Sequence, residues 1–420
     1  MITMGDSNLH RPLGSCERFF HLYSLTFPVH FCLVAQILGP VDPAKLSASL
    51  EQVRRRHPAL RVCIVDDAET GPAFFATDNP IEVRTPLTEI DANWRGVVES
   101  ELNLSFDGGL GPLMRAAALW HRGGATIVLT FHHAIVDALS GIRILDDLMR
   151  ALAGAHLDAL PPLPPVEEMI AISSPNPTFP RGGVSRAATT SKARSPDKFT
   201  ANISTLEWNP KETASLIQGC KANGSTVHGA ICAAASRHVP ASDPHTVRLH
   251  CPMDLSRIVG LESGACGVFL GAGVLEIPAT CRKSLWLEAR DVVDCLRAAR
   301  SPAAVAGMLQ WLAAEFPPTA GNDRVGEFFG SQPQSSAVIS NLGVLPLAVD
   351  YGPVALKAVW GPAMLTNLPA GRQTIGISTF DGRLRMVHQS YRPIPGLLEA
   401  IRRTLLAACS YHDKSDGRRS

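Results

Sequence analysis

The spacing of hydrophobic and polar positions predicts several amphipathic helices. Residues 42–61 read DPAKLSASLEQVRRRHPALR, where Asp42 suits a helix N-cap and Pro43 the first turn. Apolar side chains then recur at Leu46, Leu50 and Val53, which share one helical face. The same periodicity predicts three further helices, at residues 140–154, 224–239 and 395–409.

Other apolar runs predict strands joined by tight turns. Residues 113–120 (LMRAAALW) and 125–131 (ATIVLTF) are separated by HRGG, whose glycines permit the positive φ of a hairpin turn. Residues 372–392 predict a second hairpin, with residues 381–382 (DG) as its turn. Residues 246–256 (TVRLHCPMDLS) indicate a buried strand that runs into a loop. Helices mixed with mostly antiparallel strands indicate an α+β fold.

A change of composition divides the chain. The stretch after residue 160 is rich in proline and then in serine, threonine and basic residues, with little apolar periodicity. We therefore predict an N-terminal half at residues 1–160, a linker at residues 161–198 and a C-terminal half at residues 199–420. Both halves have a normal domain size, and no internal repeat is evident.

Composition and charge exclude several functions. The 420 residues are 45% hydrophobic and 18% charged, which is typical of a globular protein with a sizeable core. A formal net charge of +1 gives no general attraction to nucleic acid or to anionic membranes. The ten cysteines include no C-x-x-C pair, so we expect reduced thiols and no metal site. With no apolar segment long enough to span a bilayer, we expect a cytoplasmic protein and a monomer.

The stretch TIVLTFHHAIVDALSG, residues 126–141, carries the strongest chemical signal. His132 and His133 end a predicted strand, and Asp137 follows after three apolar residues that should anchor the turn. Such strand ends are where side chains can leave the core and face a cleft. Two alternatives stay open: hydrogen-bonded histidines without chemistry, and a metal site, which the lack of further ligands at zinc-like spacing disfavours.

These residues resemble a known family. HHAIVDA followed by SG resembles the HHxxxDG motif of the chloramphenicol-acetyltransferase-like superfamily, which includes condensation domains and polyketide-associated acyltransferases. RPLGSCERFF, LEQVRRRHPALR, TVHGAICAA, CPMDLSR, ISNLG and FDGRLRMVHQSY occur in the order seen in the standalone polyketide-associated branch. The resemblance implies two similar halves, each a mixed sheet with helices, around a central tunnel. One position departs from the motif, because Ala138 replaces the glycine after the aspartate.

The resemblance also implies roles for individual residues. His133 is the candidate general base that removes the acceptor's proton, whereas His132 is expected to pack and hydrogen-bond. Asp137 is expected to turn away from the substrate and pair with an arginine of the other half, for which we name Arg257; a solvent-facing loop position is the alternative. Gly141 follows the motif and supports the turn.

A second segment, SAVISNLGVLP, offers candidates for the opposite wall of the site. Ser340 and Asn341 follow an apolar strand and are candidates for stabilising an oxyanion through their polar groups or nearby backbone amides. An Asn-Leu-Gly turn without a chemical role is the alternative. A covalent hydrolase is disfavoured because GISTF lacks the second glycine of G-x-S-x-G.

The sequence therefore predicts an O-acyltransferase without a bound cofactor. Its donor would be an acyl thioester of coenzyme A or of an acyl carrier protein, and its acceptor a small-molecule alcohol of a secondary metabolite, polyketide or lipid. Transfer to an amine by a condensation-type enzyme is the first alternative. A noncatalytic carrier-docking or binding module is the second.

Overall fold

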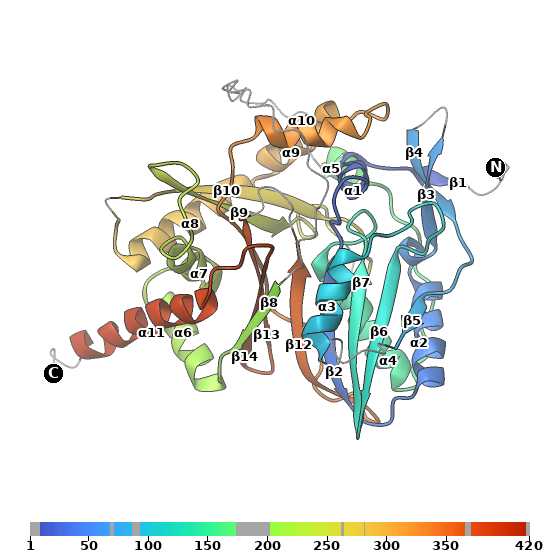
Figure 1. Ribbon diagram of the computed structural model, residues 1–420, viewed down its shortest axis with the longest axis horizontal. Helices are drawn as coiled ribbons and strands as arrows, with labels where there is room; N and C mark the ends of the chain where they lie inside the picture. The colour runs from blue at the N-terminus through green and yellow to red at the C-terminus, as the bar shows by residue number, and fades with distance from the viewer. Residues whose placement is uncertain are drawn as a thin grey trace.

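The chain folds into two halves that lie side by side (Figure 1). The computed structural model describes residues 9–67, 71–85, 93–173, 202–261, 264–280, 282–365 and 371–416. Three sheets and helices on their faces confirm the α+β prediction. Residues 174–198 of the predicted linker lie outside the described residues, and helix α5 (Val166–Ser173) occupies part of the rest.

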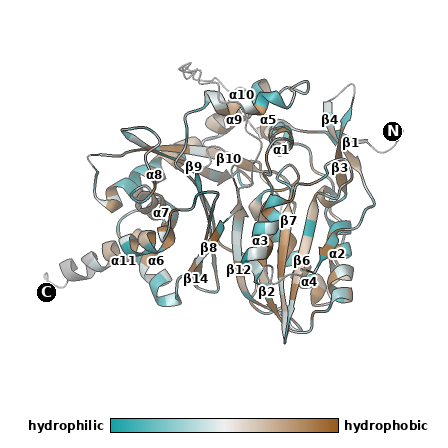
Figure 2. Cartoon of the chain, in the orientation of Figure 1, coloured by the Kyte–Doolittle hydropathy of each residue, from teal (hydrophilic) through white to brown (hydrophobic). Residues whose placement is uncertain are grey.

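A five-stranded sheet forms the centre of the N-terminal half, in the order β12-β2-β7-β6-β5. Its strands are β2 (Phe31–Leu38), β5 (Glu82–Arg84), β6 (Met114–His121), β7 (Gly124–Phe131) and β12 (Ala355–Met364). Helices α2 (Pro43–Arg56) and α4 (Ala138–Leu152) lie on one side, and α3 (Trp94–Asn103) lies on the other. With both faces covered, every residue of β7 is buried, and Figure 2 shows its hydrophobic character.

The predicted local signals of this half are confirmed. Asp42 caps α2 by accepting a hydrogen bond from the amide of Lys45 at 2.8 Å, and Pro43 is the first helical residue. Strands β6 and β7 pair through a two-residue turn, where Gly123 has a φ of +87°. A three-stranded sheet, in the order β1-β4-β3, and two shorter helical segments complete the half. These are β1 (Leu9–Pro12), β3 (Val62–Asp67), β4 (Gly71–Ala76), α1 (Ser15–Ser24) and a 3-10 helix (Pro58–Leu60).

A six-stranded sheet forms the C-terminal half, in the order β10-β9-β11-β13-β14-β8. Its strands are β8 (Asn202–Glu207), β9 (Thr246–Asp254), β10 (Leu270–Pro278), β11 (Ala337–Val344), β13 (Gln373–Phe380) and β14 (Arg383–Ser390). One face packs on α6 (Pro210–Ala222), α7 (Val227–Ala235), α8 (Leu285–Ala299) and α11 (Leu397–Asp416). Burial alternates strictly along β9, as expected for a strand with one face on this core.

Strand β12 ties the halves together. It belongs to the C-terminal part of the sequence but pairs antiparallel with β2 of the N-terminal half, with Trp360 opposite Val34. It also lies against the six-stranded sheet, because a Cβ on Gly376 would come within 1.8 Å of the carbonyl oxygen of Pro362. Helices α9 (Pro302–Glu315) and α10 (Asp323–Ser331) reach over to α1, where Phe316 and Phe328 contact Phe19. Thus the N-terminal half is completed by segments from the C-terminal part of the sequence.

Within the part of the chain that the structure describes, no helix combines enough length with enough hydrophobicity to cross a bilayer.

Candidate functional site

The histidine pair lies where β7 ends and the chain turns toward α4. The three apolar residues of the motif, Ala134, Ile135 and Val136, have exposed fractions of 0%, 2% and 0%. The amide of Ile135 donates to the carbonyl of His132 at 3.2 Å and closes the turn. This confirms that the apolar residues anchor the turn between the polar ones.

The ring of His133 is held between aromatic side chains. It stacks on Phe20 of α1, with the ring centroids 4.1 Å apart and the planes at 4°. Phe31 of β2 packs against it at 5.1 Å in a tilted arrangement. The side chain of His133 is only 6% exposed. Three elements therefore fix the orientation of one imidazole, which a positioned general base requires.

Burial keeps this imidazole neutral. It lowers the pKa of His133 from 6.5 to about 4, although backbone hydrogen bonds with His133 and Val136 partly oppose that effect. Its Nδ1 atom is buried without a geometrically well-formed hydrogen bond. At neutral pH the ring is therefore free to accept a proton.

The lowered pKa predicts an unusual pH dependence. We expect kcat/KM for acyl transfer to change less than about twofold between pH 7 and pH 5, because a base with a pKa near 4 stays neutral there. A histidine base with its ordinary pKa of 6.5 would lose about 25-fold in kcat/KM over the same range. The measurement is a pH–rate profile with circular dichroism at each pH. A tenfold fall with intact structure would contradict the assignment.

His132 serves the turn. Its Nδ1 accepts a hydrogen bond from the amide of Ala134 at 3.1 Å, which leaves the proton of the neutral ring on Nε2. The ring meets Phe106 edge-on at 5.7 Å. Burial first, and then the charges of His21 and other neighbouring cationic groups, push its pKa well below 6.5. The geometry agrees with a residue that packs and hydrogen-bonds.

Asp137 joins the two halves through backbone groups. One carboxylate oxygen accepts from the amide of Ser140 at 2.7 Å, which makes Asp137 the N-cap of α4. The other accepts from the amide of Phe269 in the C-terminal half at 2.8 Å. The amide of Asp137 in turn donates to the carbonyl of Gly267 at 3.0 Å. We call this set, with the Ser140 hydroxyl bonded to Gly267 at 2.9 Å, the Asp137 latch.

The predicted pairing of Asp137 with Arg257 was wrong. The side chain of Arg257 is exposed, and Phe269 occupies the place expected for it at the carboxylate. The cation whose charge reaches Asp137 is Arg143, which itself donates to the carbonyl of Ala265 at 3.2 Å. Burial raises the pKa of the Asp137 carboxyl, and its hydrogen bonds with two amides and with the Ser140 hydroxyl oppose that rise. Hydrogen bonds from backbone amides stabilise the charged carboxylate of Asp137, so it needs no salt bridge with an arginine side chain.

Ala138 and Gly141, which follow Asp137 in the first turn of α4, have different roles. Gly141 permits close packing of α4 on the sheet, since a Cβ there would lie 2.9 Å from Leu33 and 3.3 Å from Phe31. Ala138, which replaces the motif glycine, is the first residue of α4 and has an ordinary negative φ. Its backbone therefore needs no glycine, and its methyl group packs on the core of the N-terminal half.

Ser340 and Asn341 face opposite sides of β11. Ser340 pairs with Gly376, whose face of the sheet lies against Pro362 of β12, so Ser340 points toward the space between the halves. Asn341 points to the other side, and its Oδ1 accepts from the amide of Gly343 at 2.8 Å. This hydrogen bond closes the Asn-Leu-Gly turn, which the sequence offered as the alternative to a role at the oxyanion. Among the described residues no hydrogen bond joins either side chain to the histidine pair, and their role at an oxyanion stays a prediction.

Sequence reasoning missed the groups that hold the site. Phe20 and Phe31 position the base, and the amide of Phe269 holds Asp137. Phe20 stands in the RPLGSCERFF stretch, but an aromatic residue there is equally consistent with ordinary core packing. No local signal identifies a backbone amide as a partner.

Comparisons with solved structures identify the fold. Polyketide synthase associated protein 5 from Mycobacterium tuberculosis aligns with a TM-score of 0.67 at 18% identity, over 96% of this chain and 99% of that one. The condensation domain of the monacolin K polyketide synthase MokA gives 0.65 at 15%, over 97% and 98%. The trichothecene 15-O-acetyltransferase from Fusarium sporotrichioides gives 0.65 at 10%, over 97% and 96%. The chain has the two-lobed chloramphenicol-acetyltransferase-like fold.

Curated sequences show a more partial likeness. Nonribosomal peptide synthetase 5 of Gibberella zeae is 26% identical over 130 residues, which is 30% of this chain and 1% of that protein. Malformin synthetase of Aspergillus luchuensis is 28% identical over 126 residues, which is 29% of this chain and 2% of that protein. The matched segment thus covers only 1% to 2% of the length of these relatives. No family model matches the chain.

Proposed function

We propose that this chain is an O-acyltransferase that uses an acyl thioester of coenzyme A or of an acyl carrier protein. The observation that carries the proposal is the neutral, stacked imidazole of His133 beside the Asp137 latch, at the junction of the two halves. The likeness to condensation domains and acyltransferases supports acyl transfer in general. The curated matches in peptide and polyketide synthetases favour a carrier protein as a partner.

The chemistry asks little of the protein beyond a base and a fixed geometry. As the acceptor oxygen attacks the thioester carbonyl carbon, its proton passes to His133. The C–S bond then breaks, and the same proton goes to the departing thiolate to give a free thiol. Stacking on Phe20 keeps the ring in place during both transfers. Ser340 is the proposed hydrogen-bond donor to the oxyanion. In this proposal no bound cofactor takes part. The donor and the acceptor reach His133 through a tunnel between the two halves, which is also part of the proposal.

Mass spectrometry of the reaction products tests the function. The purified protein is incubated with acetyl, medium-chain and long-chain thioesters of coenzyme A and of acyl carrier protein, each with matched alcohols and amines. We expect an ester with at least one alcohol, and less product or none from the matched amine. An amide as the main product would favour the condensation alternative. Binding of carrier protein without any product across the panel would favour the noncatalytic module.

A further inference from the structure

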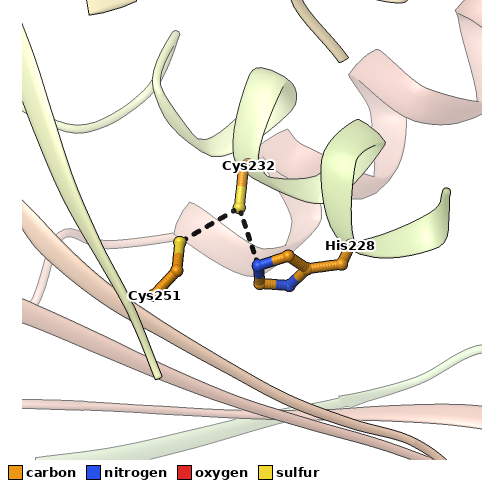
Figure 3. Close-up of side chains that lie close together, drawn as sticks. All are labelled: His228, Cys232 and Cys251. Carbon is orange, nitrogen blue, oxygen red and sulfur yellow. Dashed lines mark hydrogen bonds between the residues drawn. The ribbon is translucent and has the colours of Figure 1, made fainter. Parts of the chain in front are cut away.

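Three side chains with metal-binding atoms meet in the C-terminal half, between α7 and β9 (Figure 3). His228 and Cys232 lie four residues apart on α7, so they share one helical face. Cys251 comes from β9, which the face of α7 covers. Both cysteines have an exposed fraction of 0%, whereas His228 is half-buried. No step of the proposed transfer uses any of them.

The spacing of these atoms matches the tetrahedral coordination of a metal ion. The two sulfurs lie 3.7 Å apart, and the Sγ of Cys232 lies 3.6 Å from Nε2 of His228. Tetrahedral zinc, with bonds of about 2.3 Å to sulfur and about 2.05 Å to nitrogen, requires separations of about 3.8 Å and about 3.6 Å. All three ligand atoms lie within 4.8 Å of one another, so the third pair is also close.

We propose that His228, Cys232 and Cys251 bind a zinc ion, with a water molecule as the fourth ligand. Two thiolates and one imidazole form a donor set that favours zinc over magnesium or calcium. On binding, each thiol loses its proton to solvent, and two Zn–S bonds and one Zn–N bond form. The two thiolate charges then balance the charge of the ion within the core.

An unpartnered pair of polar atoms supports this assignment. The Nδ1 of His228 and the hydroxyl of Ser225, which precedes the N-cap of α7, are both buried without a hydrogen-bond partner. A zinc-bound histidine carries its proton on the other ring nitrogen and needs an acceptor for it. We assign this role to the hydroxyl of Ser225, which lies three residues before His228 in the chain. The Nε2 of His228 is then left to face the ion.

The ion would have a structural effect. It would join α7 to β9 within the core of the C-terminal half, and it would do so only in the folded chain. Binding to the folded state alone stabilises a protein by mass action. We therefore expect the melting temperature of the wild type to rise when zinc is added to chelator-treated protein.

The experiment measures metal binding directly. Untagged protein is stripped with a chelator under reducing conditions, reconstituted with Zn²⁺ and analysed for bound zinc; Co²⁺ serves as a spectroscopic probe. We expect one zinc per chain and the absorption bands of tetrahedral, thiolate-bound Co²⁺. Since loss of even an outer-shell partner costs about 10- to 100-fold in metal affinity, Cys232→Ser and Cys251→Ser should weaken Co²⁺ binding by at least about 100-fold.

Cys220→Ser is the matched control, because Cys220 is another buried thiol of the same core but takes no part in the cluster. It should bind zinc like the wild type. If the ligand variants fail to fold, the wild-type reconstitution and its zinc-dependent melting temperature still decide the question. Wild type without bound zinc after reconstitution overturns the proposal. So does a Cys232–Cys251 disulfide found by mass spectrometry in protein purified without reductant, or unchanged Co²⁺ spectra in both cysteine variants.

Discussion

His133→Ala is expected to lower kcat for acyl transfer by about 100- to 10,000-fold, the usual contribution of a general base. The variant removes the proton acceptor and leaves the Asp137 latch in place, since no bond of that latch involves the ring of His133. The measurement is steady-state turnover with the thioester and alcohol that the wild type uses. KM should change far less than kcat, because the imidazole acts mainly in the transition state.

His156→Ala is the control for this prediction, because His156 has a side-chain exposure of 88% and lies outside the site. Its turnover should match the wild type. A melting temperature measured for each variant separates lost chemistry from lost structure, since removal of a ring stacked on Phe20 also leaves a small cavity. Undiminished turnover in His133→Ala would show that the acceptor loses its proton in another way.

Asp137→Ala is expected to reduce the free energy of unfolding by about 2 to 4 kcal/mol. The change removes a helix N-cap, which contributes about 1 kcal/mol, and also leaves the buried amide of Phe269 unpaired, which costs about 1 to 3 kcal/mol. Turnover should fall with stability, because the turn that carries His133 loses its link to the opposite half. Urea denaturation of the wild type and the variant measures the effect.

Asp42→Ala separates the two contributions of Asp137. Asp42 also caps a helix, but it is exposed and accepts only from the amide of Lys45 within its own half. It should therefore cost only about 1 kcal/mol. Equal losses in the two variants would mean that the bond to Phe269 contributes nothing to stability. The loss of unfolding free energy in Asp137→Asn should lie between those of Asp42→Ala and Asp137→Ala, since the asparagine side chain keeps one acceptor oxygen.

The sequence predicted those elements whose signals are local. The cap at Asp42 and the DG turn at Asp381 each sit beside the residues they organise, and both are found as expected. The pairing of Val34 with Trp360 has no such signal, because the two strands are separated by most of the chain. Both strands are simply apolar runs, so their partners follow from the assembled fold.

The predicted partner of Asp137 was wrong for a related reason. HHAIVDA correctly predicted a buried, anchored turn, because its apolar residues and its capping aspartate act over a few residues. The partner of Asp137 was sought among arginines because a charged side chain is visible in a sequence. The amide of Phe269 is common to every residue type except proline, so nothing in the sequence marks it. C-x-x-C spacing is likewise uninformative about Cys232 and Cys251, because they meet only through the packing of α7 on β9.

Strand β12 has a consequence for the synthesis of the protein. Strands β2, β6 and β7 leave the ribosome more than 200 residues before β12, so for that time β2 is an unpaired edge of a hydrophobic sheet. At translation rates of about 5 to 20 residues per second, the interval lasts roughly 10 to 50 seconds. A nascent chain with such an edge is open to pairing with other chains, and we expect its yield to depend on chaperones that bind exposed strands. Slower translation before residue 355 should then increase aggregation, although the finished protein has the same sequence and stability.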